Sequence, residues 1–264
     1  MAFVLQARRF GPVNWIGCAS LLRRQFNSGF SEWHYILLGP VVSNGLYLLL
    51  FVVASSSLTG LDPQEVVIFI APGLVSFAIA ERAFEISGAN LIYQKHERIH
   101  TDWLMAPLTP TERAACFAIS STIAGLAIGS AVGLMTLLFV PPQMAHPWAV
   151  LFFGAATGMM HGLIGTLLGI WAAKWDQYTA LHTFVLVPLA FLSGVFAPVG
   201  AMPELAQRII AFNPIFYLID GFRYGMIGEA AADLRLSAAV AIGINALLFA
   251  WVHSWFRTGY RLKS

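Results

Sequence analysis

Six stretches of this sequence are long and apolar enough to cross the hydrocarbon core of a bilayer, which needs about 20 helical residues. Backbone groups find no water in lipid, so each stretch is expected to be helical. Only 11% of the residues are charged, against about 25% in soluble domains, so these runs are not the core of a soluble protein. The sequence predicts an all-α integral membrane protein in one domain, 1–264, with spans near residues 33–54, 66–86, 114–140, 148–173, 178–196 and 236–256.

Lys and Arg residues gather on one side of the predicted spans. Eleven of the fifteen fall in segments on the side that holds both termini, three fall in the connection 197–235 on the opposite side, and Arg82 lies within a span. By the positive-inside rule the richer side faces the cytoplasm, so both termini are expected there. The net charge of +2 is too small and too scattered for a nucleic-acid surface, so no nucleic-acid partner is expected.

Residues 1–31 precede the first span and superficially resemble an export signal. Pro12 and Asn14 interrupt their apolar run, and Arg23 follows too soon for a signal of adequate length, so we expect the segment to be retained. As a helix it would carry apolar residues on one face with basic residues beside them, which suits a helix lying in the cytoplasmic interface. The apolar face consists of Trp15, Cys18, Leu22 and Phe26.

The third and fourth spans carry glycines at every fourth position, which forms a smooth stripe on each helix. The short link 141–147 makes these two spans antiparallel neighbours, so we expect their backbones to approach closely. The alternative is that glycine is simply common in membrane helices. The two stripes are Gly125, Gly129 and Gly133 in the third span and Gly154, Gly158 and Gly162 in the fourth.

The connection 197–235 is long but not hydrophilic. Several prolines interrupt it, 204–212 resembles a short helix, and 215–227 is apolar with several aromatic residues. Short helices that dip back into the outer leaflet, shielded by protein, would satisfy both features. The alternative is an interfacial loop anchored by aromatic side chains.

Residues 96–100 match HExxH, the zincin pattern of two zinc ligands one helical turn apart with a glutamate base. Asp220 is the kind of residue that could supply a third ligand. Three spans separate it from His100, however, so the two would lie on opposite sides of a bilayer about 30 Å thick. We therefore favour a solvated cytoplasmic helix and expect no metal site; a membrane metalloprotease is the remote alternative.

Three charged residues, Glu81, Arg82 and Glu85, lie inside the second predicted span. A charge at the centre of a lipid-facing helix costs about 2.5–3.5 kcal/mol, so these side chains are not expected to face lipid at the midplane. One interpretation is snorkelling to the cytoplasmic interface, with Arg82 and Glu85 paired at i, i+3. The other is that they line a polar substrate route. Lone polar residues elsewhere are expected to form hydrogen bonds to neighbouring helices, with contact to a ligand as the alternative: Asn44, His161, His182 and Asn245.

The sequence indicates no catalytic triad. It also lacks GxxxxGK[ST], so the chain is not expected to bind ATP in the P-loop manner or to be an enzyme by itself. Cys18 and Cys116 have neither the number nor the spacing of a disulfide framework or a redox motif. Any energy from ATP, together with its magnesium, would have to come from another chain.

Three segments resemble the ABC-2 type, the type-2 exporter family of ATP-binding-cassette permeases. The most specific is 191–228, with its SGVF run, NP pair and GFRYG run before the last span. The others are FIAPGL at 69–74 and MAPLTPTE at 105–112. The resemblance covers the whole chain and implies a cytoplasmic amphipathic helix near 10–29, six spans, and re-entrant outer helices at 197–228.

The resemblance also implies a coupling helix at 93–106 that docks on an ATPase subunit. The charges suited to that contact are Lys95, Glu97, Arg98 and Asp102. Family members work as two permease chains with two ATP-binding chains, and their substrate path is expected between the permeases, near spans one, two and five. The charged run 81–85 departs from the family, whose second span is usually uncharged here.

These features favour a permease subunit in the bacterial inner membrane, surrounded by lipid, that exports an amphiphilic substrate. The expected classes are a lipid, a glycolipid or polysaccharide, or a drug. Each permease would pair with a second copy of itself and with two ATP-binding subunits, which would hold ATP and magnesium. The alternative is a secondary transporter or channel that works without ATP, in which Glu81 and Glu85 would carry protons or cations.

Overall fold

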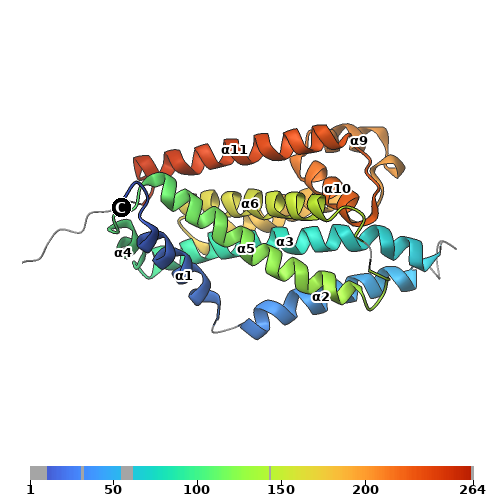
Figure 1. Ribbon diagram of the computed structural model, residues 1–264, viewed down its shortest axis with the longest axis horizontal. Helices are drawn as coiled ribbons and strands as arrows, with labels where there is room; N and C mark the ends of the chain where they lie inside the picture. Colours follow the sequence, from blue (N-terminus) through green and yellow to red (C-terminus); the bar gives the residue numbers. More distant parts are fainter. Residues whose placement is uncertain (1–10, 31–32, 55–61, 143, 263–264) are drawn as a thin grey trace, which may run out of the picture.

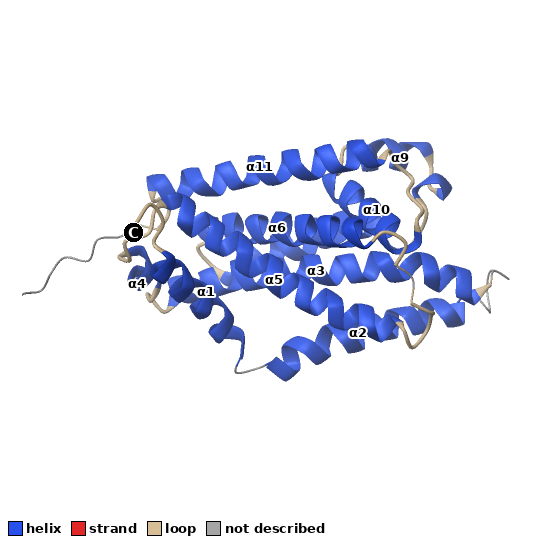
Figure 2. Ribbon diagram, viewed as in Figure 1, coloured by secondary structure: helices blue, strands red, loops and turns tan. Residues whose placement is uncertain are grey.

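The computed structural model describes residues 11–30, 33–54, 62–142 and 144–262. Within these ranges every regular element is a helix (Figure 2), and six helices have the length and hydropathy to cross a membrane. Both predictions, the all-α class and the six spans, are confirmed. The elements are α1 Trp15–Phe30, α2 Trp33–Ala54, α3 Pro63–His96, α4 His100–Leu104, α5 Pro110–Thr136, α6 Pro147–Trp171, α7 Trp175–Leu181, η2 His182–Leu186, α8 Val187–Ala190, η3 Phe191–Val195, η4 Val199–Ala201, α9 Glu204–Ala211, α10 Pro214–Ile227 and α11 Leu234–Thr258.

The second span is longer than its apolar run. The sequence predicts 66–86, whereas α3 has 34 residues and is about 51 Å long at 1.5 Å per residue. Asp62 caps its first turn by accepting a hydrogen bond from the Gln64 N–H, and Pro63 occupies the first position, where no N–H is needed. The charged residues from 81 to 85 do not end the helix, because backbone bonding continues through them to His96.

The fifth span is irregular. Two π-helical turns, η2 and η3, interrupt it, and Pro188, which has no N–H to donate, lies between them. The chain leaves helical geometry at Ser193 and at Gly194, whose φ of +83° favours glycine. Figure 1 places α1, α4 and the last turn of α11 at one end of the bundle, called here the α4 end. The opposite end carries η4 and α9 and is called the α9 end.

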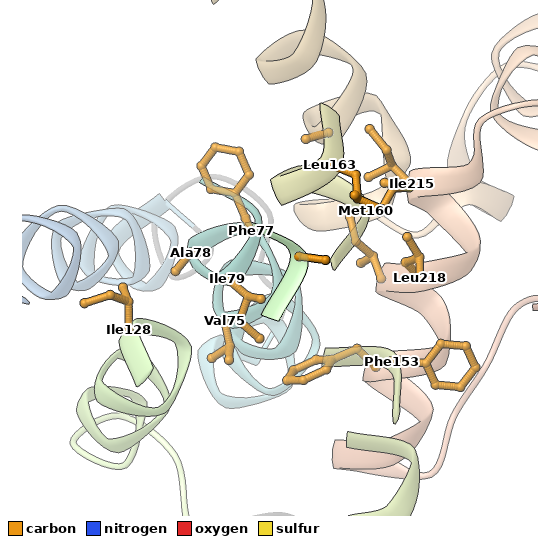
Figure 3. Close-up of a cluster of buried hydrophobic side chains, with 14 of the residues drawn as sticks. Val75, Phe77, Ala78, Ile79, Ile128, Phe153, Met160, Leu163, Ile215 and Leu218 are labelled. Atoms are coloured by element: carbon orange, nitrogen blue, oxygen red, sulfur yellow. The ribbon is translucent and has the colours of Figure 1, made fainter. Parts of the chain in front are cut away.

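Helix α3 lies at the centre of the bundle and contacts α2, α5, α6 and α10. Figure 3 shows its side chains Val75 and Ile79 among residues of the surrounding helices. All of these side chains are buried. The neighbours include Ile128 of α5, Phe153, Met160 and Leu163 of α6, and Leu218 of α10. A helix in this position can link the two ends of the bundle.

Helix α1 packs against α5 beside this core. Among its side chains that the structure describes, Leu21 and Gln25 are buried, whereas Trp15 is 75% exposed. The other members of the apolar face expected from the sequence, Cys18, Leu22 and Phe26, are half-buried. The expected interfacial position of residues 1–31 remains a prediction, and residues 1–10 lie outside the described part of the chain.

Candidate functional site

The glycine stripe of α5 packs against α3. A Cβ atom at Gly125 would lie 2.7 Å from the backbone oxygen of Ile79, and one at Gly129 would overlap the Ile79 side chain. At Gly133 the nearest atom is Val75 Cγ2, at an ordinary contact distance of 3.9 Å. The stripe therefore permits close backbone approach at two of its three positions. Its partner is α3, not α6 as the sequence suggested.

The glycine stripe of α6 packs mainly against α5. A Cβ at Gly158 would lie 3.1 Å from Thr122 Cα, and one at Gly162 would overlap the Ser121 side chain. Gly154 faces Leu126 and also Phe222 of α10. The third and fourth spans are thus neighbours, as expected, but each stripe selects a different partner because α3 lies beside both helices.

Arg82 and Glu85 form an ion pair on α3, with 2.9 Å between the guanidinium and carboxylate atoms. The Arg82 side chain is only 11% exposed, whereas that of Glu85 is 63% exposed. The i, i+3 pairing expected from the sequence is present. Glu85 points away from the bundle interior, so a molecule approaching this face of α3 would meet its carboxylate.

Glu81 lies one turn before Glu85 on α3 but is half-buried, and it lines a small cavity together with His161 of α6 and His182 of η2. The volume is about 10 Å³, close to the minimum that holds one water molecule. His161 is buried, and its Nδ1 lies 2.9 Å from the Thr157 backbone oxygen. Three titratable side chains from three helices therefore meet inside the membrane-spanning region. The sequence marked both histidines only as lone polar residues, because no local spacing connects 81, 161 and 182.

Aromatic rings form one side of this cluster. Phe84 stacks on His182 and on Tyr178, with ring centroids 4.7 Å and 4.8 Å apart. The Tyr178 hydroxyl donates to the Phe84 backbone oxygen at 3.2 Å, so the rings hold α7 and η2 against α3. The cluster thus combines one carboxylate, two imidazoles and aromatic faces around a space for about one water molecule.

The helix α10 joins the α9 end to the broken fifth span. Asn213 caps α10 by accepting from the Ile215 N–H, and its amide donates to the Ser193 hydroxyl and the Leu189 oxygen. The two short helices expected within 197–235 are present as α9 and α10. With 14 residues, α10 is about 21 Å long and too short to cross a bilayer. Its depth in the membrane remains a prediction.

Arg223 ties α10 to two other elements. Its guanidinium donates to the Gly194 oxygen at 2.5 Å, lies 4.0 Å from the centroid of the Phe69 ring, and lies 3.9 Å from the Asp220 carboxylate. Asp220 also accepts backbone N–H bonds from Ala231 at 2.9 Å and Ala232 at 2.9 Å. The GFRYG and FIAPGL segments therefore meet at one junction beside the break in the fifth span.

Lys95 is directed into the protein and not toward a docking surface. Its ammonium donates to the backbone oxygens of Gly169, Ile170 and Ala172, at 2.6–3.2 Å. These carbonyls end α6, where a cation is favoured by the helix dipole. This position revises the role expected for Lys95, because its side chain stabilises the end of α6.

The segment 93–106 is not one helix. Helix α3 ends at His96, a turn follows, and α4 begins at His100. Arg98 lies in this turn with a φ of +56°. His96 is exposed and His100 is buried, so the break places the two imidazoles in different environments instead of on adjacent turns of one helix. Asp220, considered above as a third zinc ligand, lies beside Arg223 on α10. Among the described residues no group of three His, Cys, Asp or Glu could hold a metal ion.

Exposed acidic residues lie at this turn and in α4, and α1 packs beside them. Glu97 in the turn and Asp102 in α4 are exposed. Arg24 of α1 donates to the Ile99 oxygen at 3.0 Å and lies 3.8 Å from the Asp102 carboxylate. Glu112, in the MAPLTPTE segment, forms a capping box with Thr109 at the start of α5. Its carboxylate also accepts a hydrogen bond at 2.7 Å from the backbone N–H of Asn14, the residue before α1.

Comparison with known proteins identifies the family to which this helical bundle belongs. The model of the family described as "ABC-2 type transporter" matches residues 17–227. The chain belongs to the ABC-2 type transporter family. The inner membrane transport permease YadH of Escherichia coli K12 is 30% identical over 252 residues, which cover 95% of this chain and 98% of that protein. Nodulation protein J of Rhizobium leguminosarum bv. viciae is 25% identical over 240 residues, which cover 87% and 88% of the two chains. The family expected from the sequence is confirmed, and the chain is a transport permease.

Proposed function

We propose that this permease is the membrane subunit of an ATP-driven exporter of an amphiphilic substrate. Membership of the ABC-2 family carries this proposal. Permeases of this family generally pair with ATP-binding subunits and act as dimers. The α4 end would face the cytoplasm, in agreement with its basic residues, and ATP with magnesium would bind to the partner subunits.

The exposed turn 97–99 and Asp102 would form the contact with the ATP-binding subunit. They follow directly on α3, so a push at this turn would move a helix that also carries Glu81 and contacts Phe191 and Val195 near the α9 end. A transporter of this kind alternates between two states, and nucleotide shifts their balance only by binding them with different affinity. Lys95 would maintain the end of α6 beside this contact and would not bind the partner.

The second copy of the chain would cover α2 and the fifth span. Only 11% of the residues in the most apolar stretch of α2 are buried, against 72% for α3. The share is 28% for both the fifth span and α11, and of these two the fifth span contacts α3, as α2 does. Glu85 lies on α3, which has both elements among its neighbours, so its carboxylate would face the route between two copies. The polar part of the substrate would contact Glu85 and Arg82 there, and its apolar part would remain among the exposed apolar side chains of α2.

Charge reversal at the proposed docking turn tests this function. We expect Arg98→Glu to reduce the ATP-hydrolysing subunit that purifies with the tagged permease and to reduce substrate-stimulated hydrolysis in the complex. The matched control is Arg208→Glu in α9, where an arginine side chain is 80% exposed at the opposite end. Equal recovery and equal stimulation for wild type and both variants would exclude docking at this turn.

The cavity shared by Glu81, His161 and His182 favours a second candidate function, transport without ATP. Titratable residues that meet inside a membrane are typical of proton relays. In that case, proteoliposomes holding the permease alone would accumulate substrate in response to a proton gradient, and Glu81→Gln would abolish this uptake. Transport only in the presence of the ATP-binding subunit and ATP would exclude this function.

A further inference from the structure

An apolar groove lies between α5, α6 and α11, away from the charged residues of α3. Figure 1 shows α5 diverging from α11 toward the α9 end. The groove has a volume of about 1070 Å³, at the upper limit of sites for drug-sized ligands. Representative lining residues are Ile119 and Ile123 of α5, Ala155 and Met159 of α6, and Ile242 and Phe249 of α11. Its lining is almost entirely hydrocarbon and is suited to lipid tails.

Two contacts fix the shape of this groove. Midway along α11, the Asn245 amide donates to the Ala156 oxygen of α6 at 3.1 Å. This bond holds α11 against α6, the helix between the two sides of the groove. At the α4 end, Phe256 of α11 packs on Phe117 of α5, with ring centroids 5.6 Å apart. The groove therefore narrows toward the α4 end and widens toward the α9 end. A flexible chain could enter from the wide end without moving a helix.

The wide end carries groups suited to a lipid head group. Trp148, which lines the groove, is 58% exposed at the first turn of α6, a position typical of aromatic anchors at the membrane interface. Arg235 is exposed and lies seven residues before Ile242, so both are on the same face of α11. Its nearest acid in sequence, Asp233, accepts the backbone N–H groups of Arg235 and Leu236. Within the described residues, the Arg235 guanidinium forms no ion pair.

We propose that this groove is a binding site for an anionic phospholipid from the leaflet at the α9 end. The acyl chains would fill the groove between α5 and α11, and the phosphate would pair with Arg235. Charge complementarity favours this occupant, since Arg235 lies two turns beyond Ile242 on the face of α11 that lines the groove. The site is separate from the proposed substrate route, so it does not depend on the identity of the substrate.

Native mass spectrometry of the purified full-length permease, titrated with palmitoyl-oleoyl phosphatidylglycerol in detergent, tests this site. Arg235→Gln should weaken the first lipid adduct about five-fold. Arg257→Gln is its control, because it removes an exposed arginine from the opposite end of the same helix. Ala246→Phe should abolish the adduct by placing a ring in the groove, whereas Leu247→Phe, on the opposite face of α11, should retain it.

Three outcomes would overturn the proposal. Equal lipid binding by all four variants would indicate only a nonspecific lipid shell. A larger loss for Arg257→Gln than for Arg235→Gln would place the head group at the α4 end. Loss of the dimer mass in Ala246→Phe, with the monomer folded by its unchanged melting temperature, would assign this groove to a second copy of the chain.

Discussion

Replacing Gly125 with alanine tests the packing of α5 on the central helix α3. The added Cβ would lie 2.7 Å from the Ile79 backbone oxygen and 3.2 Å from Ala83 Cβ. Ordinary contacts of a Cβ begin at 3.4 Å, so the first distance is short by about 0.7 Å (3.4 minus 2.7). The obstructing atom belongs to the backbone of α3 and cannot rotate away, so the two helices must separate.

The expected cost follows from two opposing effects. Overpacking of a well-packed interior costs about 1–3 kcal/mol. Alanine recovers about 1 kcal/mol because it is the better helix former. We therefore expect Gly125→Ala to lower the free energy of unfolding by about 0–2 kcal/mol, which is about 1–3 minus about 1. At about 2–4 °C per kcal/mol, the melting temperature should fall by up to about 8 °C.

Gly133→Ala is the matched control, on the same stripe two turns away. Its Cβ would meet only Val75 Cγ2, at 3.9 Å, so the helix-propensity gain should remain and the melting temperature should be unchanged or rise. Both variants can be compared by thermal unfolding in detergent, followed by tryptophan fluorescence. If Gly125→Ala is as stable as Gly133→Ala, close contact between α3 and α5 does not limit stability.

Two further substitutions examine the ends of the bundle. Lys95→Met should destabilise the protein by about 2 kcal/mol, since it removes three hydrogen bonds to the carbonyls that end α6, and chemical unfolding should show Lys95→Arg retaining part of that stability. Arg223→Gln should cost about 3–5 kcal/mol because it leaves Asp220 buried beside an uncharged partner; the double variant with Asp220→Asn should be more stable than the single one in thermal unfolding. If Asp220→Asn changes the stability equally in the wild type and in Arg223→Gln, the two charges are not coupled.

Much of the fold could be predicted because lipid imposes strong local rules. A run of apolar residues must be helical, which located all six spans, and proline or a capping side chain set several helix starts, as at Thr109 and Asn213. The helical pattern also predicted that Arg82 and Glu85, three residues apart, lie next to each other on the surface of α3. The break after His96 was less predictable, because its charged and polar residues are equally compatible with a continuing helix.

The site was only partly predictable. Glu81 stood out from the sequence by its charge, but the cavity that it shares with His161 and His182 depends on how three helices are rotated about their axes. Lys95 had the composition of a docking residue, yet the end of α6, more than seventy residues away in sequence, determines its contacts. The glycine stripes could be found on each helix, but not the helix that each stripe would meet.

The sequence by itself determined which segments cross the membrane, their helical state and the family. The first two properties follow from transfer into lipid, which each segment undergoes by itself, and the family follows from short segments such as 191–228. The tertiary structure alone decided which faces meet: α3 at the centre, Arg223 against Gly194, and a groove beside α11. Lipid tails are as apolar as leucine, so hydrophobicity does not distinguish a face that contacts protein from one that contacts lipid. Only shape, close approach of backbones and polar contacts make that choice, and all three require the helices to be together.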